Sequence, residues 1–530
     1  MTKNARLVFS FFTGILLALP WYQQFSGLFI LVAFVPLLFV EDFFYQHKKV
    51  FKPSDVFTYA TLAFLTWNIL TTFWIKNSDI FAAATVILLN TFFMSLTFLF
   101  FHITKRKFGY KAGNFSLIIY WISFEYLFLH AHLTWPWLNL GNSFAGDISF
   151  IQWYEYTGVL GGTLWILLIN LLLFKTLKFF KQKKAQILNI TFFILLLVIP
   201  ILVSKIIFKN YKETGKEIKV ALIQPNFDPY NEKYQIPQDD QLSTILNLSD
   251  SIIDTSINYI IAPETAISDP IWEHNLKSDS LILEIKNLVK EHLKVNYIIG
   301  ASTYKKLNDN KKIPFTAKYD AKDRCYYNAH NSALQIDTSD YIPIYYKSKL
   351  VSGVETMPFL YFLGFLENFI LDFGGVSGSL GIQKEREVFF NINLNISIAP
   401  VICYESAFGE HVSEYIKKRA NFIFILTNDG WWGDTPGYKQ HLNYASLRAI
   451  ETRRSIARSA NTGISAFINQ KGEIIQSTNW WTKVAIKNSL RANNKITFYV
   501  KYGDYIGRLA GFLAIVFFLY AFVKQLIQKQ

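Results

Sequence analysis

Long stretches without charged side chains dominate the first 205 residues of the chain. Residues 7–40 carry no charge, and a polar turn at Gln23, Gln24 and Ser26 splits them into two segments. Each segment is close to the roughly 20 apolar residues that a membrane helix needs. Further charge-free stretches cover 56–75, 80–104, 156–174, 186–204 and 509–523, and Glu125 alone interrupts 115–130. The pattern predicts eight membrane helices, seven before residue 205 and one near the C-terminus.

The first apolar run follows Lys3 and Arg6, an arrangement that also fits a cleaved signal peptide. No small-residue cleavage site follows it, and a second apolar run begins at once. We therefore expect a retained helix. Glu125 is expected to be the one acid inside a span, and because an ionisable group is costly there, it should face the bundle or a water-filled cavity. A structural hydrogen-bonding role is favoured over a catalytic one.

Residues 210–505 show a different pattern, in which short β-rich runs alternate with polar segments of helical character. The runs are 218–223, 259–262, 297–301, 396–403 and 422–427, and the helical segments include 277–295 and 440–455. This alternation is typical of a layered α/β domain. The expected organisation is a membrane domain at 1–209, an α/β catalytic domain at 210–505 and a terminal helix at 506–530.

Composition supports the membrane assignment, because 51% of the residues are hydrophobic and only 17% are charged, against about a quarter in ordinary globular chains. The net charge of +14 is concentrated in alternate connections between the predicted helices. These connections hold Lys3, Arg6, Lys48, Lys49, Lys52, Lys105, Arg106, Lys107, Lys111, Lys175, Lys178, Lys181, Lys183, Lys184, Lys524 and Lys529, whereas the opposite short loops hold only Lys76.

Basic residues mark the cytoplasmic side of a membrane protein. We therefore expect both termini in the cytoplasm and residues 210–505 outside it, on the periplasmic side of a bacterial inner membrane. The same location explains the positive charge without a nucleic-acid partner. The chain has two cysteines, too few for a disulfide framework or a four-cysteine zinc site.

Three segments of the α/β region place reactive side chains just after predicted strands. Glu264 follows Ala262-Pro263, Lys347 follows Tyr345-Tyr346, and Cys403 ends the run 396–403. A thiol is a weak nucleophile, so a carboxylate must take its proton, and a cation can stabilise the thiolate and a carbonyl oxyanion. Each residue alone is more often structural or solvated. The ordered set indicates acyl transfer through a thioester.

Other residues carry weaker expectations. Tyr404 and Glu405 directly follow the cysteine and are candidates for shaping an acyl pocket, or else for local structure. Trp431 and Trp432 follow a turn sequence, where they would contact lipid chains or pack between domains. His441 has no metal partner at ligand spacing and Cys325 is expected to be structural. No metal or cofactor is expected.

The contexts APET, YYKSKLV and ICYES, in the order Glu, Lys, Cys, resemble the nitrilase/amidase superfamily. The flanking spans and the segments 220–226, 427–434, 448–451 and 458–465 resemble its membrane branch, the apolipoprotein N-acyltransferases, and so does Trp135-Pro136-Trp137-Leu138. The resemblance covers nearly the whole chain. It implies an αββα sandwich for the catalytic domain.

The resemblance also implies residue roles. Glu264 would be the general base, Lys347 the partner of the oxyanion and thiolate, and Cys403 the nucleophile, while Glu355 would orient Lys347. Lys349 is a rival for the lysine role, but the eight-residue interval to Glu355 favours Lys347. This chain has Ser352-Gly353-Val354-Glu355 where family members often have Pro-Phe-Gly-Glu, so the loop shape is expected to differ there.

The implied reaction moves a fatty acyl chain from a membrane phospholipid to the α-amine of a diacylglyceryl-modified N-terminal cysteine on an apolipoprotein, by a monomeric enzyme. Two other hypotheses stay open. A membrane-tethered amidase or nitrilase would share the three residues but use water as acceptor, and eight spans exceed what a tether needs. A transporter would need paired charges within the membrane and repeated halves, and the sequence contains no repeat.

Overall fold

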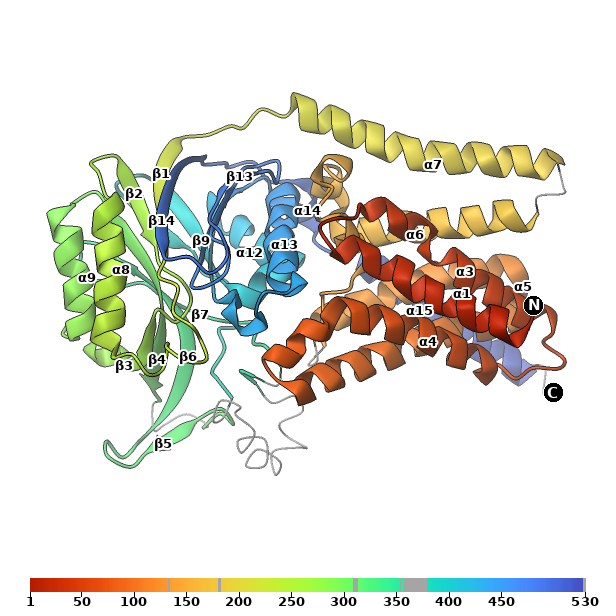
Figure 1. Cartoon of the computed structure of the whole chain (residues 1–530), viewed down its shortest axis with the longest axis horizontal. Helices are drawn as coiled ribbons and strands as arrows, with labels where there is room; N and C mark the ends of the chain where they lie inside the picture. The colour runs from red at the N-terminus through yellow and green to blue at the C-terminus, as the bar shows by residue number, and fades with distance from the viewer. Residues whose placement is uncertain (132–133, 180–182, 308–312, 353, 357–378, 528–530) are drawn as a thin grey trace. The chain divides into compact units, whose positions relative to one another are not determined.

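The computed structural model describes residues 1–131, 134–179, 183–307, 313–352, 354–356 and 379–527, so Lys181, Gly353 and Lys529 lie outside the described residues. The chain packs as two compact units (Figure 1). The helical unit comprises residues 1–211, 435–447 and 502–530, and the sheet unit comprises 212–434 and 448–501. The predicted domain boundaries place 435–447 with the catalytic domain, whereas these residues pack with the helices.

The helices of the helical unit follow the charge-free stretches of the sequence. They are α1 (Lys3–Ala18), α2 (Ile30–Ala33), α3 (Val35–Gln46), α4 (Ser54–Thr72), α5 (Ile80–His130), α6 (Tyr154–Lys178), α7 (Lys183–Asn210) and α15 (Tyr505–Ile527). Within the described residues, six helical segments are long and apolar enough to cross a membrane, and Tyr505–Tyr520 is a shorter apolar helix. The chain is therefore a membrane protein.

Two predicted spans, 80–104 and 115–130, fall in the single element α5. Gly109 lies between them with φ +83°, so the helix is broken there. A left-handed backbone conformation of this kind is readily adopted only by glycine. α5 is therefore two helical segments joined at Gly109, which agrees with the two separate apolar runs.

Glu125 is buried in α5 and all its hydrogen-bond partners lie in the helical unit. It accepts hydrogen bonds from Trp121 Nε1 (3.0 Å), the Leu140 backbone N–H (2.8 Å) and Thr163 Oγ1 (2.6 Å). Thr163 belongs to α6, and Leu140 begins the short helix η4 (Leu140–Phe144). Glu125 therefore ties three elements together, in keeping with a structural role.

The expectation that Glu125 is the only acid inside a span was wrong. Glu41 and Asp42 lie in α3, within the apolar segment Gly27–Gln46, and both are buried. His102 Nδ1 lies 2.7 Å from Glu41, Lys105 pairs with Glu41, and Lys178 Nζ lies 2.6 Å from Asp42. The two acids sit next to a basic connection in the sequence, but long basic side chains from α5 and α6 reach into the bundle to pair with them.

In the part of the sheet unit that the structure describes, the strands form an eight-stranded and a six-stranded sheet. The first has the order β14–β1–β2–β4–β6–β5, with β3 beside β4 and β7 beside β6; the second has the order β13–β12–β11–β10–β9–β8. Their bounds are β1 Glu217–Gln224, β2 Ile257–Ile261, β3 Ile267–Trp272, β4 Asn296–Lys306, β5 Lys318–Asp320, β6 Cys325–Ile336, β7 Ile344–Tyr346, β8 Phe389–Asn391, β9 Ile396–Ile402, β10 Phe422–Thr427, β11 Ser455–Ala460, β12 Ala466–Ile468, β13 Ile474–Ser477 and β14 Val484–Arg491.

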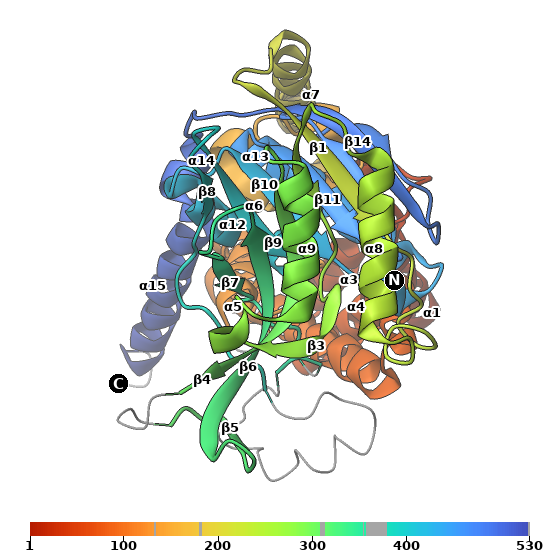
Figure 2. The ribbon, with the colours of Figure 1, turned by 90° about the vertical axis from the view of Figure 1, so that its left-hand side faces the viewer.

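The central strands are parallel and buried on both faces, which explains their continuous apolar runs. β1, β2 and β4 pair in parallel, as do β9, β10 and β11. Helices α8 (Gln238–Ile252) and α9 (Ser280–Glu291) cover the outer face of the first sheet (Figure 2). Tyr259 of β2 meets Phe424 of β10 with ring centroids 5.3 Å apart, so the two sheets pack face to face. Helix α12 (Gly409–Lys417) follows the second sheet's strand β9.

Helix α13 (Pro436–Thr452) begins in the helical unit. Its Gln440 accepts a hydrogen bond from Trp137 Nε1 at 2.7 Å, and the Tyr444 hydroxyl donates to the Trp137 carbonyl at 2.7 Å. His441 is buried with its ring 5.7 Å from that of Trp137. Residues 135–138 and 435–447 therefore pack together. The sequence of neither segment predicts this contact.

Candidate active site

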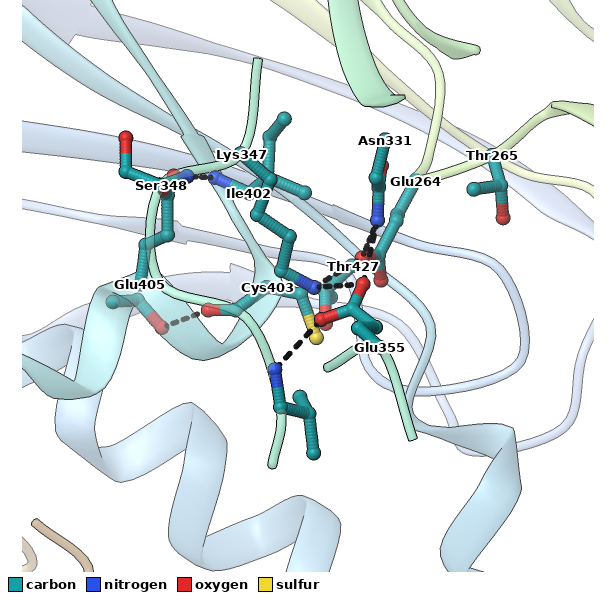
Figure 3. Close-up of polar contacts among 12 residues, drawn as sticks. Glu264, Thr265, Asn331, Lys347, Ser348, Glu355, Ile402, Cys403, Glu405 and Thr427 are labelled. Atoms are coloured by element: carbon teal, nitrogen blue, oxygen red, sulfur yellow. Dashed lines mark hydrogen bonds and ion pairs between the residues drawn. The ribbon is translucent and has the colours of Figure 1, made fainter. Parts of the chain in front are cut away.

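Cys403 lies where strand β9 meets the short helix η8 (Cys403–Ala407), with φ +48°. A positive φ is unfavourable for a residue with a side chain and commonly marks a functional turn. The Ser406 hydroxyl donates to the Cys403 carbonyl at 2.7 Å. Cys403 is 8% exposed, and Figure 3 shows its sulfur near the ammonium of Lys347. The predicted strand-to-turn corner therefore exists and holds the thiol on a rigid support.

Glu264 follows β2 in a second tight turn. Thr265, the next residue, has φ +46°. The Gly300 backbone N–H of β4 donates to the Pro263 carbonyl at 3.1 Å, and a Cβ on Gly300 would come within 2.7 Å of Glu264 Cα. The turn can approach β4 this closely because residue 300 is glycine. This contact sets the position of the Glu264 carboxylate.

The structure brings Glu264, Lys347 and Glu355 together, although Glu264 and Glu355 are 91 positions apart in the sequence. Lys347 Nζ donates to Glu264 Oε1 at 2.8 Å and to Glu355 Oε1 at 2.9 Å. Asn331 Nδ2 donates to the same two oxygens, at 2.8 and 3.0 Å (Figure 3). The Val351 backbone N–H holds Glu355 Oε2 at 2.8 Å. Each carboxylate is therefore fixed by two separate donors from the same lysine and asparagine.

The electrostatic setting keeps Glu264 and Lys347 charged. Burial opposes ionisation of Glu264, but the charge and hydrogen bond of Lys347, with help from Asn331 and Lys233, hold its pKa below the usual value. Burial likewise disfavours the Lys347 ammonium, but Glu264 and Glu355 raise its pKa well above the ordinary value. A carboxylate that stays ionised in a buried site can serve as a general base.

The thiol of Cys403 has the opposite setting. Burial raises its pKa, and the negative charge of Glu264 raises it further, while Lys347 and a hydrogen bond with Thr427 partly offset the shift. The resting residue is therefore a neutral thiol. Nucleophilic attack requires transfer of its proton. Two carboxylates, Glu264 and Asp429, act on the thiol electrostatically, and Asp429 is paired with Arg458, so Glu264 is the candidate for this role.

Glu405 joins the cysteine turn to the lysine segment. Its side chain is fully buried and accepts hydrogen bonds from the backbone N–H groups of Ile402 (2.8 Å) and Ser348 (2.7 Å) and from the Tyr345 hydroxyl (2.7 Å). Burial opposes its ionisation, but His411 and the two backbone donors keep its pKa below the usual value. Because Ile402 precedes Cys403 and Ser348 follows Lys347, Glu405 fixes the spacing of the two reactive segments.

The contacts of the remaining predicted residues are mainly with aromatic rings. Tyr404 is buried with its ring 5.1 Å from that of Phe408, and Lys349 Nζ lies 5.0 Å from the same ring. Trp431 and Trp432 are half-buried in η9 (Asp429–Trp432), and the Trp431 ring meets Tyr230 at 5.2 Å. Both cysteines are free, so Cys325 does not block the nucleophile.

Sequence reasoning missed Asn331, Thr427 and Lys233. Asn331 lies inside β6, where nothing in the local pattern separates it from an ordinary strand residue. Thr427 ends β10, and its hydroxyl donates to Asp429 Oδ1 at 3.0 Å. Lys233 lies in a polar segment after β1 that reads as a solvated loop, yet it is 2% exposed. The position of Thr427 at the end of a strand is a signal that could have identified it.

The two sheets carry a buried carboxylate–lysine pair beside a cysteine, and the same chain has long apolar helices. These features define a membrane protein of the carbon–nitrogen hydrolase class. Residues 219–491 match the family model for carbon-nitrogen hydrolases, and residues 13–172 match that for the apolipoprotein N-acyltransferase N-terminal domain. The chain belongs to the apolipoprotein N-acyltransferase family.

Relatives match along most of the chain. The apolipoprotein N-acyltransferase of Wigglesworthia glossinidia brevipalpis is 30% identical over 84% of this chain and 83% of its own length. That of Chlorobaculum tepidum is 26% identical over 92% of this chain and 91% of its own length. Among solved structures, the nitrilase-superfamily protein Nit3 of Saccharomyces cerevisiae is 13% identical, with a TM-score of 0.37 over 53% of this chain and 92% of that protein.

Proposed function

We propose that this chain moves a fatty acyl group from a membrane phospholipid to the α-amine of a lipid-modified N-terminal cysteine on an apolipoprotein, through a thioester on Cys403. Family membership makes the chain an N-acyltransferase that acts in lipoprotein maturation. The observation that carries the route through a thioester is the buried Glu264–Lys347 ion pair, with a 2.8 Å contact, beside a neutral thiol.

In the first half-reaction, Glu264 takes the proton from Cys403 Sγ as the sulfur attacks the ester carbonyl carbon. The carbonyl oxygen becomes an oxyanion, and Lys347 stabilises its charge. When the tetrahedral intermediate collapses, the ester C–O bond breaks. The lysophospholipid leaves with the proton from Glu264, and the acyl group remains on sulfur.

In the second half-reaction, the neutral α-amine of the apolipoprotein attacks the thioester carbonyl. Glu264 takes one proton from the nitrogen as the amide forms. The C–S bond breaks, and that proton returns to the sulfur. The thiol is thereby restored, and no cofactor, oxidant or metal enters the balance of either step.

Supporting roles are proposed for Glu355 and Glu405. Glu355 shares Lys347 and Asn331 with Glu264, so it would keep the lysine aimed at the reaction centre. Glu405 would keep the Cys403 turn at a fixed distance from Lys347. Tyr404, Trp431 and Trp432 remain proposed contacts for acyl chains.

For the membrane arrangement, we propose eight spans in the bacterial inner membrane, counting α5 as two and α15 as one. The basic residues of alternate connections support cytoplasmic termini and a periplasmic catalytic domain. Both substrates carry lipid chains, so a membrane enzyme receives them laterally. We propose that the enzyme works as a monomer without nucleic acid.

Cysteine replacement tests the thioester. The purified chain in detergent is incubated with phospholipid labelled in its acyl chain, and the acylated residue is mapped by mass spectrometry. We expect label on Cys403 and its loss in Cys403→Ala and Cys403→Ser, while Cys325→Ala, the matched control, keeps it. Undiminished label on the Cys403 variants would refute the assignment.

A second incubation separates acyl transfer from hydrolysis. The labelled enzyme is mixed either with a diacylated lipopeptide or with small amides. We expect the lipopeptide to remove the label and gain the acyl chain. Hydrolysis of small amides without acylation of the lipopeptide would favour a tethered amidase instead.

A further inference from the structure

A second lysine approaches the Glu264 turn and is not explained by the roles above. Lys233 lies in the segment between β1 and α8, and its Nζ donates to Thr265 Oγ1 at 2.5 Å and to the Glu264 carbonyl at 3.4 Å. Figure 3 shows Thr265 and Lys347 on opposite sides of Glu264. Lys233 therefore contacts the turn from the side that Lys347 does not reach.

Lys233 is held in place by its own segment and by helix α8. Its backbone N–H donates to the Asp228 carbonyl at 2.9 Å, and its carbonyl accepts from Gln241 Nε2 at 2.7 Å. Gln238, the first residue of α8, binds the far end of the turn, through the Ala266 carbonyl (3.1 Å) and the Ser268 backbone N–H (2.7 Å). The segment and the start of α8 therefore each support the Glu264 turn at one point, and Lys233 is the contact from the segment.

The ammonium has no carboxylate of its own. Among the residues described, no carboxylate oxygen lies within 4 Å of Lys233 Nζ, and its two hydrogen-bond acceptors are neutral oxygens. A buried, unpaired ammonium is costly, and burial lowers the pKa of Lys233 to about 8 while Glu264 and Cys403 oppose this shift. Its electrostatic partners are thus the base and the thiol.

The balance of charges around Cys403 indicates a role for Lys233. Glu264 and Glu355 share the single cation Lys347, which leaves one excess negative charge beside a thiol that must become an anion. In a desolvated site an excess negative charge opposes formation of a thiolate or an oxyanion. One further buried positive charge, at Lys233, balances the two carboxylates.

We propose that Lys233 is a positioning residue of the thiol centre, which fixes the Glu264 turn from behind and adds a second positive charge, besides that of Lys347, that helps to keep Glu264 ionised. This inference rests on the proposed thioester route. In this role, Lys233 acts through Glu264 and does not contact the substrate. The charged or titratable groups that face Glu264 are Lys347 after β7, Lys233 and Tyr234 after β1, and Cys403 after β9, with Glu355 acting through Lys347.

The test separates the charge of Lys233 from its hydrogen bonds. A glutamine side chain can still donate to Thr265 and the Glu264 carbonyl but carries no charge, whereas arginine keeps the charge. The full-length chain in detergent is mixed with labelled phospholipid, and the single-turnover rate of Cys403 acylation is measured against pH for Lys233→Gln, Lys233→Met and Lys233→Arg. Thermal unfolding reports the fold of each variant.

Loss of the charge should raise the pKa of Glu264, because a cation that lowers it is gone. The acid limb of the acylation rate should therefore move to higher pH in Lys233→Gln and Lys233→Met. At a pH on that limb, below the pKa of Glu264, the rate should be about tenfold lower for a pKa change of about one unit. Lys233→Arg should keep the acid limb of the wild type. Lys286→Met, which removes another buried lysine of the sheet unit, is the matched control and should match the wild type.

A wild-type rate and acid limb in Lys233→Gln would overturn the inference. So would a Lys233→Gln variant in which fewer molecules react but the acid limb is unmoved, since that pattern reports only damage to the fold. Failure of the wild-type chain to label Cys403 would contradict the proposed function itself. That failure is visible before any Lys233 variant is compared.

Discussion

At the residue scale, the candidate site is built from charges that depend on one another. Lys347 neutralises two carboxylates at once, and Asn331 donates to the same pair of oxygens. Asn331 is neutral, so it orders Glu264 and Glu355 without changing the charge balance. The motifs APET and YYKSKLV identified Glu264 and Lys347, whereas Asn331 becomes visible only when β6 and β7 pair and bring its side chain to them.

A carboxylate at position 331 should upset this balance. In Asn331→Asp, a third negative charge lies beside Glu264 and raises its pKa, so the acid limb of Cys403 acylation should move to higher pH. At a pH on that limb, the rate should fall by about tenfold for a pKa change of about one unit. In the wild type, the lowered pKa of Glu264 predicts that acylation fails only below the usual glutamate range as pH falls. Single-turnover labelling of Cys403 against pH measures the acid limb of the variant and of the wild type. An unmoved acid limb in Asn331→Asp would contradict the proposed charge balance around Glu264. Asn328→Asp, on the same strand, is the control.

At the scale of elements, two strand ends carry the chemistry on strained turns. Cys403 and Thr265 both have positive φ. The Cys403 turn is held by the hydrogen bond from the Ile402 backbone N–H to Glu405, and the Glu264 turn by the hydrogen bond from the Gly300 backbone N–H to Pro263. The predicted strands 259–262, 297–301 and 396–403 correspond to β2, β4 and β9 with ends within a few residues. The turn geometry was not predictable, because it depends on contacts between strands far apart in the sequence.

The contact at Gly300 gives a prediction for this scale. A Cβ there would lie 2.6 Å from the Pro263 carbonyl oxygen and the Thr265 nitrogen, so Gly300→Ala must displace the Glu264 turn. We expect a stability loss of about 1–3 kcal/mol and a larger proportional loss of Cys403 labelling. Thermal unfolding and thioester yield are the measurements. Gly146→Ala, where a Cβ meets nothing within 4 Å, should change neither, and a Gly300→Ala variant with normal labelling would show that the contact does not position the base.

At the scale of the whole molecule, charge and hydrophobicity divide the chain between membrane and water. The family assignment made from the motifs is confirmed by two family models and by relatives that match most of the chain. The orientation remains a prediction from the basic connections. Within the helical unit, the buried pairs of Glu41 and Asp42 with basic residues join α3, α5 and α6. Such pairs are one of the two features that a transporter would need, but the second, a repeat of the sequence, is not found in the chain.

Orientation can be tested with reporters. Fusions of a fluorescent protein, which folds in the cytoplasm, and of a periplasm-dependent phosphatase are placed at the C-terminus and after Lys294, an exposed residue of the sheet unit. The C-terminal fusion should fluoresce and lack phosphatase activity, and the fusion after Lys294 should show the reverse. Fluorescence at both positions would contradict the orientation. A phosphatase fusion after Lys76, the one base in the short loops of the opposite side, should be active and is the control.

The sequence by itself determined where the chain meets the membrane and which strand ends carry a carboxylate, a lysine and a thiol, because both are local properties: runs of apolar residues and short motifs at the ends of β-rich segments. Only the tertiary structure decided which other groups share the site. Asn331, Lys233 and Glu405 act through burial, distance and charge between segments far apart in the chain, and the electrostatic effect of each depends on neighbours that no local pattern specifies.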